Sequence, residues 1–230
     1  MDKTKNVLDS LLLIQIPQYG LILFTIINIV AIICYPGGTY WNESAPIYSF
    51  TNNFLSDLGR TMSHSKEINF ISSQLFNISL IMTGCIFTFF YIKVIKVFNR
   101  MFSNIILKFG SFAGILGGVS IAGVGFTPAD LFFDLHVFFA HWLFRFMLIA
   151  SICYVPAIYF HPQLKNKYAY GYILFCMSIL FYIIFSELGP SPKTSLFALQ
   201  LQVVAQKIIL FVFMFSIYIQ TIGIQKLYQK

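Results

Sequence analysis

Six stretches of the chain are long and apolar enough to cross a lipid bilayer. They lie at about residues 18–34, 68–92, 105–126, 134–160, 168–185 and 200–223. A spanning helix needs roughly 20 apolar residues, because the hydrocarbon core is about 30 Å thick and a helix rises about 1.5 Å per residue. The sequence therefore predicts an all-α, polytopic integral membrane protein. We expect residues 1–230 to form a single transmembrane domain, a bundle of six helices.

The composition leaves no part of the chain for a water-soluble domain. Charged residues make up 10% of the chain, against about 25% in an ordinary soluble domain. The net charge is +7, but the basic residues are scattered between the apolar stretches, which argues against binding of nucleic acid. The cysteines form no CxxC pair and no Gly-rich phosphate loop follows a strand, so we expect no metal and no cofactor.

Lysine and arginine residues indicate how the bundle sits in the membrane. On one side of the six-helix arrangement lie Arg60, Lys66 and Lys193; on the other lie Lys3, Lys5, Lys93, Lys96, Arg100, Lys108, Lys165, Lys167, Lys226 and Lys230. The positive-inside rule places the richer side in the cytoplasm. Both termini are therefore predicted to be cytoplasmic.

The stretch "APIYSFTNNFLSDLGRT", residues 45–61, falls in the first outer loop and mixes aromatic with polar residues. Irregular backbone at membrane depth must be covered by protein, so we expect this loop to lie at the interface or to enter the mouth of the bundle. Within it, "SDLGR" predicts a tight turn. Ser56 and Asp57 would bond nearby backbone N–H groups and Gly59 would adopt a positive φ, with direct chemistry by Asp57 as the alternative.

The fourth stretch opens with a helix-start signal. In "TPADLFFDLH", Thr127 and Asp130 form a capping box, with Pro128 as the first helical residue.

A polar stripe then runs down the same predicted helix. Asp130, Asp134, His141 and Arg145 lie within about 60° of one another on a helical wheel, whereas His136 points away. A charge at the centre of the membrane costs about 2.5–3.5 kcal/mol, and Asp134 lies about 16 Å from Arg145 along the axis. Arg145 should therefore be paired with a carboxylate from another helix or with buried carbonyl groups.

Other helices bring polar groups to a similar depth, which predicts an outward-facing polar pocket capped by the first loop. Its candidate lining residues are Asp57, Asn77, Asp134, His141, Arg145, Glu187 and Lys207. The alternative is structural: an isolated polar residue in a span often joins two helices, and Arg145 and Lys207 could serve in ion pairs that only stabilise the bundle.

The third stretch, "GSFAGILGGVSIAGVGF", places Gly114 and Gly118 four residues apart. Such spacing lets helix backbones approach closely. It favours tight packing inside the bundle over a hinge or a helix-mediated homo-oligomer.

"YPGG" at the end of the first span, "NNFLSDLGR" before the second and "GVGFTPAD" with a later "LH" (Gly123 to Asp130, then His136) resemble a known family. The family is the prokaryotic six-span membrane family of unknown function of the DUF 998 type, which is distantly similar to the Frag/DRAM/Sfk membrane proteins. The resemblance implies the same topology and a multi-pass position in the plasma membrane of a bacterial or archaeal cell. It implies no catalytic residues.

Four functions remain open, one of them a secondary transporter, for which the sequence shows no inverted repeat and no matched pair of Gly/Pro-broken spans. Of the other three, the first is binding of a membrane lipid or small anionic amphiphile, with Arg145 and Lys207 holding the head group. The second is a metal-dependent intramembrane hydrolase similar to the alkaline ceramidases, with candidates Ser56, Asp57, His136 and His141. That similarity implies zinc on three histidines, two of them four residues apart, whereas His136 and His141 are five apart and we expect His64 and His161 to lie in opposite loops. The third is a structural or assembly role in a membrane complex. No reaction is indicated by the sequence, and no catalytic residue is assigned.

Overall fold

A computed structural model describes residues 8–98 and 104–228. These residues form six helices of membrane-spanning length and no β-strand. The helices are α2 (Ile16–Ile33), α3 (Phe70–Phe98), α4 (Asn104–Phe126), α5 (Phe133–Tyr159), α6 (Lys167–Leu188) and α7 (Leu196–Tyr228), with a short π-helix η1 (Leu11–Gln15) leading into α2 and a short 3-10 helix η2 (Leu55–Gly59). The predicted all-α, six-helix architecture is confirmed.

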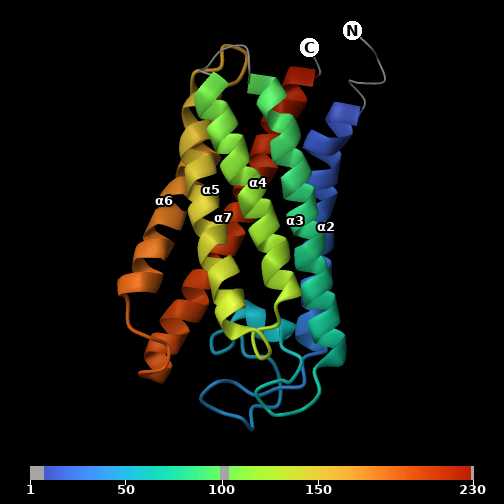
Figure 1. Ribbon diagram of the computed structural model, residues 1–230, viewed down its shortest axis with the longest axis vertical. Coiled ribbons are helices and arrows are strands. Elements are labelled where there is room, and N and C mark those ends of the chain that lie inside the picture. The colour runs from blue at the N-terminus through green and yellow to red at the C-terminus, as the bar shows by residue number, and fades with distance from the viewer. Residues whose placement is uncertain (1–7, 99–103, 229–230) are drawn as a thin grey trace.

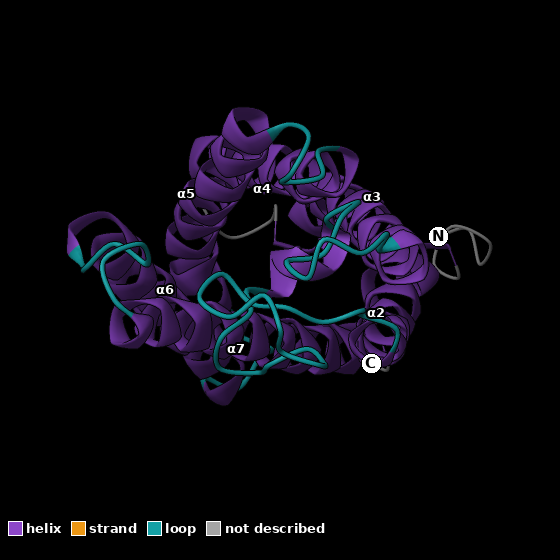
Figure 2. Cartoon of the chain, turned by 90° about the horizontal axis from the view of Figure 1, so that it is seen from below, coloured by secondary structure: helices purple, strands orange, loops and turns teal. Residues whose placement is uncertain are grey.

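The helices run antiparallel in chain order around a ring (Figures 1 and 2). Each packs against its neighbour in sequence, and α7 returns to α2 to close the ring. Several helices are longer than the apolar stretches suggested: α3 continues to Phe98 and α7 runs from Leu196 to Tyr228. The extensions carry Lys93, Lys96 and Lys226, whose long side chains let a helix continue past the apolar region.

The basic residues divide between the two ends of the bundle as the sequence predicts. Lys93, Lys96, Lys108, Lys165, Lys167 and Lys226 belong to the end at which η1 begins and α7 ends, which we call the basic end; Arg60, Lys66 and Lys193 belong to the opposite end, which we call the loop end (Figure 1). Lys3, Lys5, Arg100 and Lys230 lie outside the described residues. The assignment of the basic end to the cytoplasm stays a prediction.

Aromatic side chains fill the half of the bundle next to the basic end. Tyr91, Tyr154 and Tyr172 are fully buried, and the hydroxyl groups of Tyr91 and Tyr172 lie 3.2 Å apart. The glycines of α4 make room for this packing: a Cβ on Gly114 would overlap the Tyr91 ring, and one on Gly118 would lie 2.8 Å from a backbone nitrogen of α3. Both glycines thus serve packing inside the bundle, as predicted.

The predicted start of the fourth helix, with a capping box and Pro128 as the first helical residue, is wrong. Helix α5 begins at Phe133. The Asp130 carboxylate is engaged elsewhere, because it accepts the N–H groups of Thr61 at 3.0 Å and Met62 at 2.9 Å, together with the Thr61 hydroxyl at 2.6 Å. Burial alone would raise the pKa of Asp130, but these donors stabilise the charged form and the net effect lowers it.

Candidate functional site

Residues 34–69, which we call the mouth loop, enter the ring of helices from the loop end. Figure 2 shows η2 inside the ring, and its Asp57, Leu58 and Gly59 are buried. Of the two predicted positions of this loop, at the interface or in the mouth of the bundle, the structure shows the second. The predicted positive φ of Gly59 is wrong, since only Gly37 and Gly38 among the described glycines have it. Gly59 is instead required by close approach: a Cβ there would lie 2.5 Å from the Asn77 side-chain oxygen.

Side-chain amides of Asn77 in α3 and of Asn69, the residue before α3, hold η2. Asn77 donates from Nδ2 to the Gly59 carbonyl at 3.0 Å, and Asn69 donates to the carbonyls of Leu58 at 3.0 Å and Arg60 at 2.8 Å. Backbone carbonyls of an irregular buried segment need such partners, because leaving them unpaired costs free energy. Asn77, a predicted pocket residue, therefore positions the turn.

Helix α7 holds the preceding part of the mouth loop. The Gln206 Oε1 accepts the N–H of Leu55 at 2.8 Å, and the Lys207 ammonium donates to the Asn53 carbonyl at 2.6 Å. The same ammonium lies 5.0 Å from the centre of the Phe50 ring, a distance typical of a cation–π contact. Lys207 is buried at 4% exposure and acts as an anchor for the loop.

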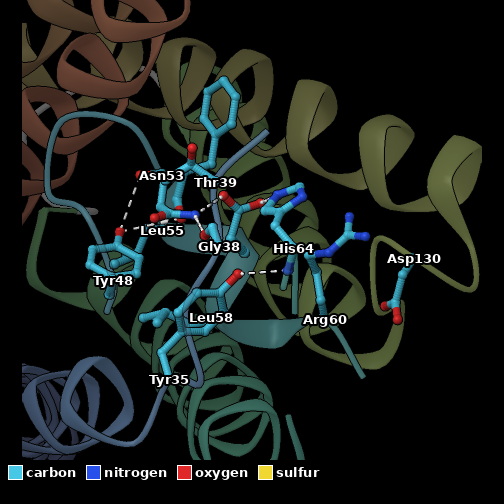
Figure 3. A network of polar contacts seen from close by, with 12 residues as sticks. Tyr35, Gly38, Thr39, Tyr48, Asn53, Leu55, Leu58, Arg60, His64 and Asp130 are labelled. Atoms are coloured by element: carbon cyan, nitrogen blue, oxygen red, sulfur yellow. Dashed lines mark hydrogen bonds and ion pairs between the residues drawn. The ribbon is translucent and has the colours of Figure 1, made fainter. Parts of the chain in front are cut away.

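Asn53 joins the parts of the mouth loop to one another (Figure 3). Its side chain accepts the N–H of Ser49 at 2.9 Å and donates to the Gly38 carbonyl at 3.0 Å and to Oδ2 of Asp57 at 3.1 Å. The other carboxylate oxygen of Asp57 lies 3.2 Å from Nε2 of His64. The carboxylate thus bonds side chains of its own loop, and not the backbone N–H groups that the turn prediction assigned to it.

Two tyrosines support this network. The backbone N–H of His64 donates to the Tyr35 hydroxyl at 3.2 Å, and the Tyr48 hydroxyl donates to the Asn53 carbonyl at 3.2 Å. Burial raises the pKa of Tyr35 to about 12 and also raises the pKa of Tyr48. Both phenols therefore stay protonated at neutral pH and act as neutral hydrogen-bonding groups.

A cavity of about 560 Å³, which we call the vestibule, lies between the mouth loop and the loop-end parts of α5, α6 and α7. Its acidic, basic and histidine lining residues are Asp57, Arg60, His64, His136, His141 and Lys193. A second cavity of about 140 Å³, the inner chamber, is reached further along the helices. All six spanning helices contribute to it, and its lining is mainly apolar, including Leu21, Phe76, Ile121, Met147, Ile179 and Phe213.

The two cavities share part of their lining. Ser56, His136, Ala140, Phe144 and Gln206 border both. We call these five residues the neck. The vestibule and the chamber are therefore adjacent, and a polar compartment passes directly into an apolar one.

The predicted pocket residues divide into those that line the vestibule and those that do not. Asp57 and His141 line it. Arg145 forms an ion pair with Glu187 of α6 and donates to the His141 carbonyl of its own helix at 3.0 Å. Of the two predicted kinds of partner, the carboxylate from another helix is therefore confirmed. This ion pair does not line the vestibule, and neither do Asn77, Asp134 and Lys207.

The stripe predicted on the fourth helix faces differently than expected. Asp134 is exposed, whereas His136, predicted to point away from the pocket, is buried at 7% exposure and borders both cavities. A helical wheel places these two residues correctly relative to one another. It gives no information on which face meets the other helices. Of the predicted stripe, His141 lines the vestibule, whereas Asp134 and Arg145 do not.

Besides His136, three charged or histidine residues of the vestibule were not predicted as pocket residues: Arg60, His64 and Lys193. All lie in connecting segments, where the sequence shows only isolated basic residues. His64 and His161 lie at opposite ends of the bundle, as expected. His64 nevertheless lines the same cavity as His136 and His141. Within residues 8–98 and 104–228, no group of three or more His, Cys, Asp or Glu side chains could hold a metal ion. The described residues thus do not form the zinc site that the hydrolase interpretation requires.

Comparisons with known proteins give no relative for this architecture. No protein-family model, no curated protein and no solved structure matches the chain.

Proposed function

We propose that the protein binds a lipid or another amphiphile with an anionic head group. The head group lies in the vestibule and the hydrocarbon tail enters the inner chamber. The observation that carries this proposal is the shared neck, which joins a compartment lined by ionisable side chains to an apolar one inside the bundle. Ligand sites combine apolar walls with a few placed polar groups in this way.

The charges of the vestibule favour an anion. Arg60 and Lys193 face a single carboxylate, that of Asp57, which is already bonded to Asn53 and His64. The Arg60 guanidinium donates from Nε to the Met62 carbonyl at 3.1 Å, and its terminal nitrogens bond no other described residue. A guanidinium with free N–H groups suits a phosphate or carboxylate head group.

This proposal changes the predicted head-group residues. Arg145 and Lys207 already have partners, Glu187 and the Asn53 carbonyl respectively. We assign the head-group contacts to Arg60 and Lys193 instead.

The test measures binding of dodecyl phosphate to the purified protein by native mass spectrometry and calorimetry. A hydrogen bond to a charged group contributes about 1.5–3 kcal/mol, so Arg60→Gln and Lys193→Gln should each weaken binding about tenfold or more. Lys66→Gln is the matched control, since Lys66 belongs to the same loop but pairs with Glu43 at the surface. Equal affinity in all four proteins, or absence of binding, would overturn the proposal.

We also propose that the basic end faces the cytoplasm of a bacterial or archaeal cell, so that the vestibule faces outward. The distribution of lysines supports this orientation. Membrane-impermeant thiol labelling of Lys66→Cys and Lys165→Cys, in a background without the native cysteines, distinguishes the two ends in whole cells. Membership in the DUF 998-type family is part of the same proposal and rests on the sequence motifs alone.

A hydrolase is the second candidate, because Ser56, Asp57, His64, His136 and His141 all line the vestibule. Metal analysis of the purified protein, together with assays of ester and amide hydrolysis, separates this candidate from simple binding. Stoichiometric zinc and turnover that depends on Asp57 would favour it. Absence of metal, turnover and bound amphiphile would favour an assembly role.

A further inference from the structure

The neck carries three polar side chains, Ser56, His136 and Gln206, between the charged vestibule and the apolar chamber. We propose that these three residues recognise an uncharged polar linkage that joins the head group to the tail of the amphiphile. Such a linkage is an ester or amide carbonyl with a neighbouring hydroxyl or N–H group. The inference rests on the proposed function and names the class of its ligand.

His136 offers a hydrogen-bond acceptor to the neck. Its Nδ1 lies 2.6 Å from the Thr127 carbonyl oxygen, and a carbonyl can only accept. Nδ1 must therefore carry the proton, and in the neutral ring Nε2 keeps its lone pair. This Nε2 bonds no other described residue, so the ring is held in place through one nitrogen and presents the other to a ligand.

Gln206 offers a donor. Its Oε1 accepts the N–H of Leu55 at 2.8 Å, which fixes the orientation of the amide because a backbone N–H requires an oxygen partner. The NH₂ group of Gln206 is therefore turned away from that bond. The hydroxyl of Ser56, the residue that follows Leu55, can donate and accept.

The three groups together match a linkage and do not match a bare hydrocarbon chain. An ester or amide carbonyl can accept from Gln206 and Ser56, while a hydroxyl or N–H beside it donates to His136. A plain alkyl chain through the neck would remove water from these groups and leave them unpaired. An unpaired buried polar group weakens binding by about tenfold to a hundredfold.

Two probes with the same charge and similar chain length test this inference. Dodecyl phosphate has no polar linkage, whereas 1-lauroyl lysophosphatidic acid has an ester and a hydroxyl between phosphate and chain. Dissociation constants for both are measured by native mass spectrometry and calorimetry in the same detergent. We expect the wild-type protein to bind the lysophosphatidic acid at least about tenfold more tightly.

Variants assign that preference to the neck. Ser56→Ala and His136→Phe should each reduce the preference severalfold. They weaken binding of the lysophosphatidic acid, which loses a partner, and strengthen binding of dodecyl phosphate, whose chain then leaves one polar group fewer unpaired. Ser186→Ala is the matched control, because Ser186 lines the vestibule but not the neck and its hydroxyl already donates to the Ile183 carbonyl. If His136→Phe does not fold because it has lost the bond to Thr127, the comparison of Ser56→Ala with the wild type tests the inference alone.

The outcomes separate the two proposals. Equal affinity of the wild type for the two probes overturns the linkage site and leaves the head-group site standing. A preference that survives Ser56→Ala and His136→Phe also overturns it. Failure of both probes to bind overturns the head-group proposal and, with it, the linkage site.

Discussion

The half of the bundle at the basic end is filled by aromatic rings, whereas the half at the loop end is hollow and is closed by hydrogen bonds. In the first half, Phe90, Tyr91 and Tyr154 are fully buried among one another. In the second half, the side chain of Asn53 bonds Gly38 and Asp57, and the side chain of Asn69 bonds the carbonyls of Leu58 and Arg60. The Asn53 carbonyl also accepts a bond from Lys207 of α7.

The difference shows how one bundle can combine a rigid part with an adaptable part. Dense apolar packing leaves no space for a ligand and makes every lost methyl group costly. Hydrogen bonds can be exchanged for bonds to water or to a ligand, so a loop held by them can open without unfolding the bundle. The vestibule lies on the hydrogen-bonded side of this division. The inner chamber lies where the two halves meet, since Met147 and Phe175 of the packed core line it.

The largest effect is expected in the aromatic half. Phe90→Ala should lower the free energy of unfolding by about 3–5 kcal/mol, because it leaves a cavity among buried rings. Unfolding of the purified protein by sodium dodecyl sulfate or heat measures the change. The control is Phe112→Ala, at a position that is 58% exposed on α4, where we expect a change within about 0.5 kcal/mol. Similar losses in both variants would show that the basic half is not a distinct packed core.

The next effect is expected at Asn69, which precedes α3 and bonds η2. Asn69→Ala removes the donor to two carbonyls, those of Leu58 and Arg60, and should cost about 1–3 kcal/mol of unfolding free energy in the same assay. Gln74→Ala, at an exposed position on α3, serves as the control. If Asn69→Ala and Gln74→Ala lowered the free energy of unfolding equally, the hydrogen bonds of Asn69 would not be what stabilises the mouth loop.

A smaller and local effect is expected for Lys207→Met. The change removes a charge-assisted bond to Asn53 but also removes the cost of burying an ammonium, so global stability should change little. Hydrogen exchange of residues 49–55 should become about tenfold faster, while exchange of residues 87–98 stays the same. Lys66→Met is the control for loss of a basic side chain. Faster exchange in both segments would mean that the two halves unfold together.

The smallest effect concerns pH. The folded-state pKa of Asp130 is lowered, so its contribution is fully present above the ordinary carboxyl range near pH 4 and is lost as pH falls through the lowered value. The melting temperature of the wild type should therefore drop more steeply below about pH 4 than that of Asp130→Asn. Parallel melting profiles for the two proteins would show that Asp130 does not fasten the mouth loop.

Features that depend on local sequence were predicted correctly. The six helices, the grouping of basic residues by end and the close packing at Gly114 and Gly118 follow from apolar length, loop composition and residue size. The need of Arg145 for a partner could also be predicted, since a charge in an apolar span must be paired, but Glu187 could not be chosen among the acidic residues without the position of α6.

The site was predicted only in part, because it is made by contacts between distant segments. Asp57 and His141 were predicted for the pocket. His64 meets Asp57 through a turn of the mouth loop, and Lys193 arrives from the connection between α6 and α7; no periodic pattern relates these residues. Lys207 was recognised as unusual, yet its partner is a backbone carbonyl, and a sequence gives no sign of which carbonyl is near.

The sequence by itself determined that the chain forms six membrane-length helices with a basic end and a polar loop, because bilayer thickness and the cost of unpaired backbone groups act on each segment separately. Only the tertiary structure decided which face of α5 turns inward. It placed His136 in the neck and left Asp134 exposed. The physical reason is that a helix fixes the angles between its own side chains, whereas its rotation within the bundle is set by the packing of all its neighbours.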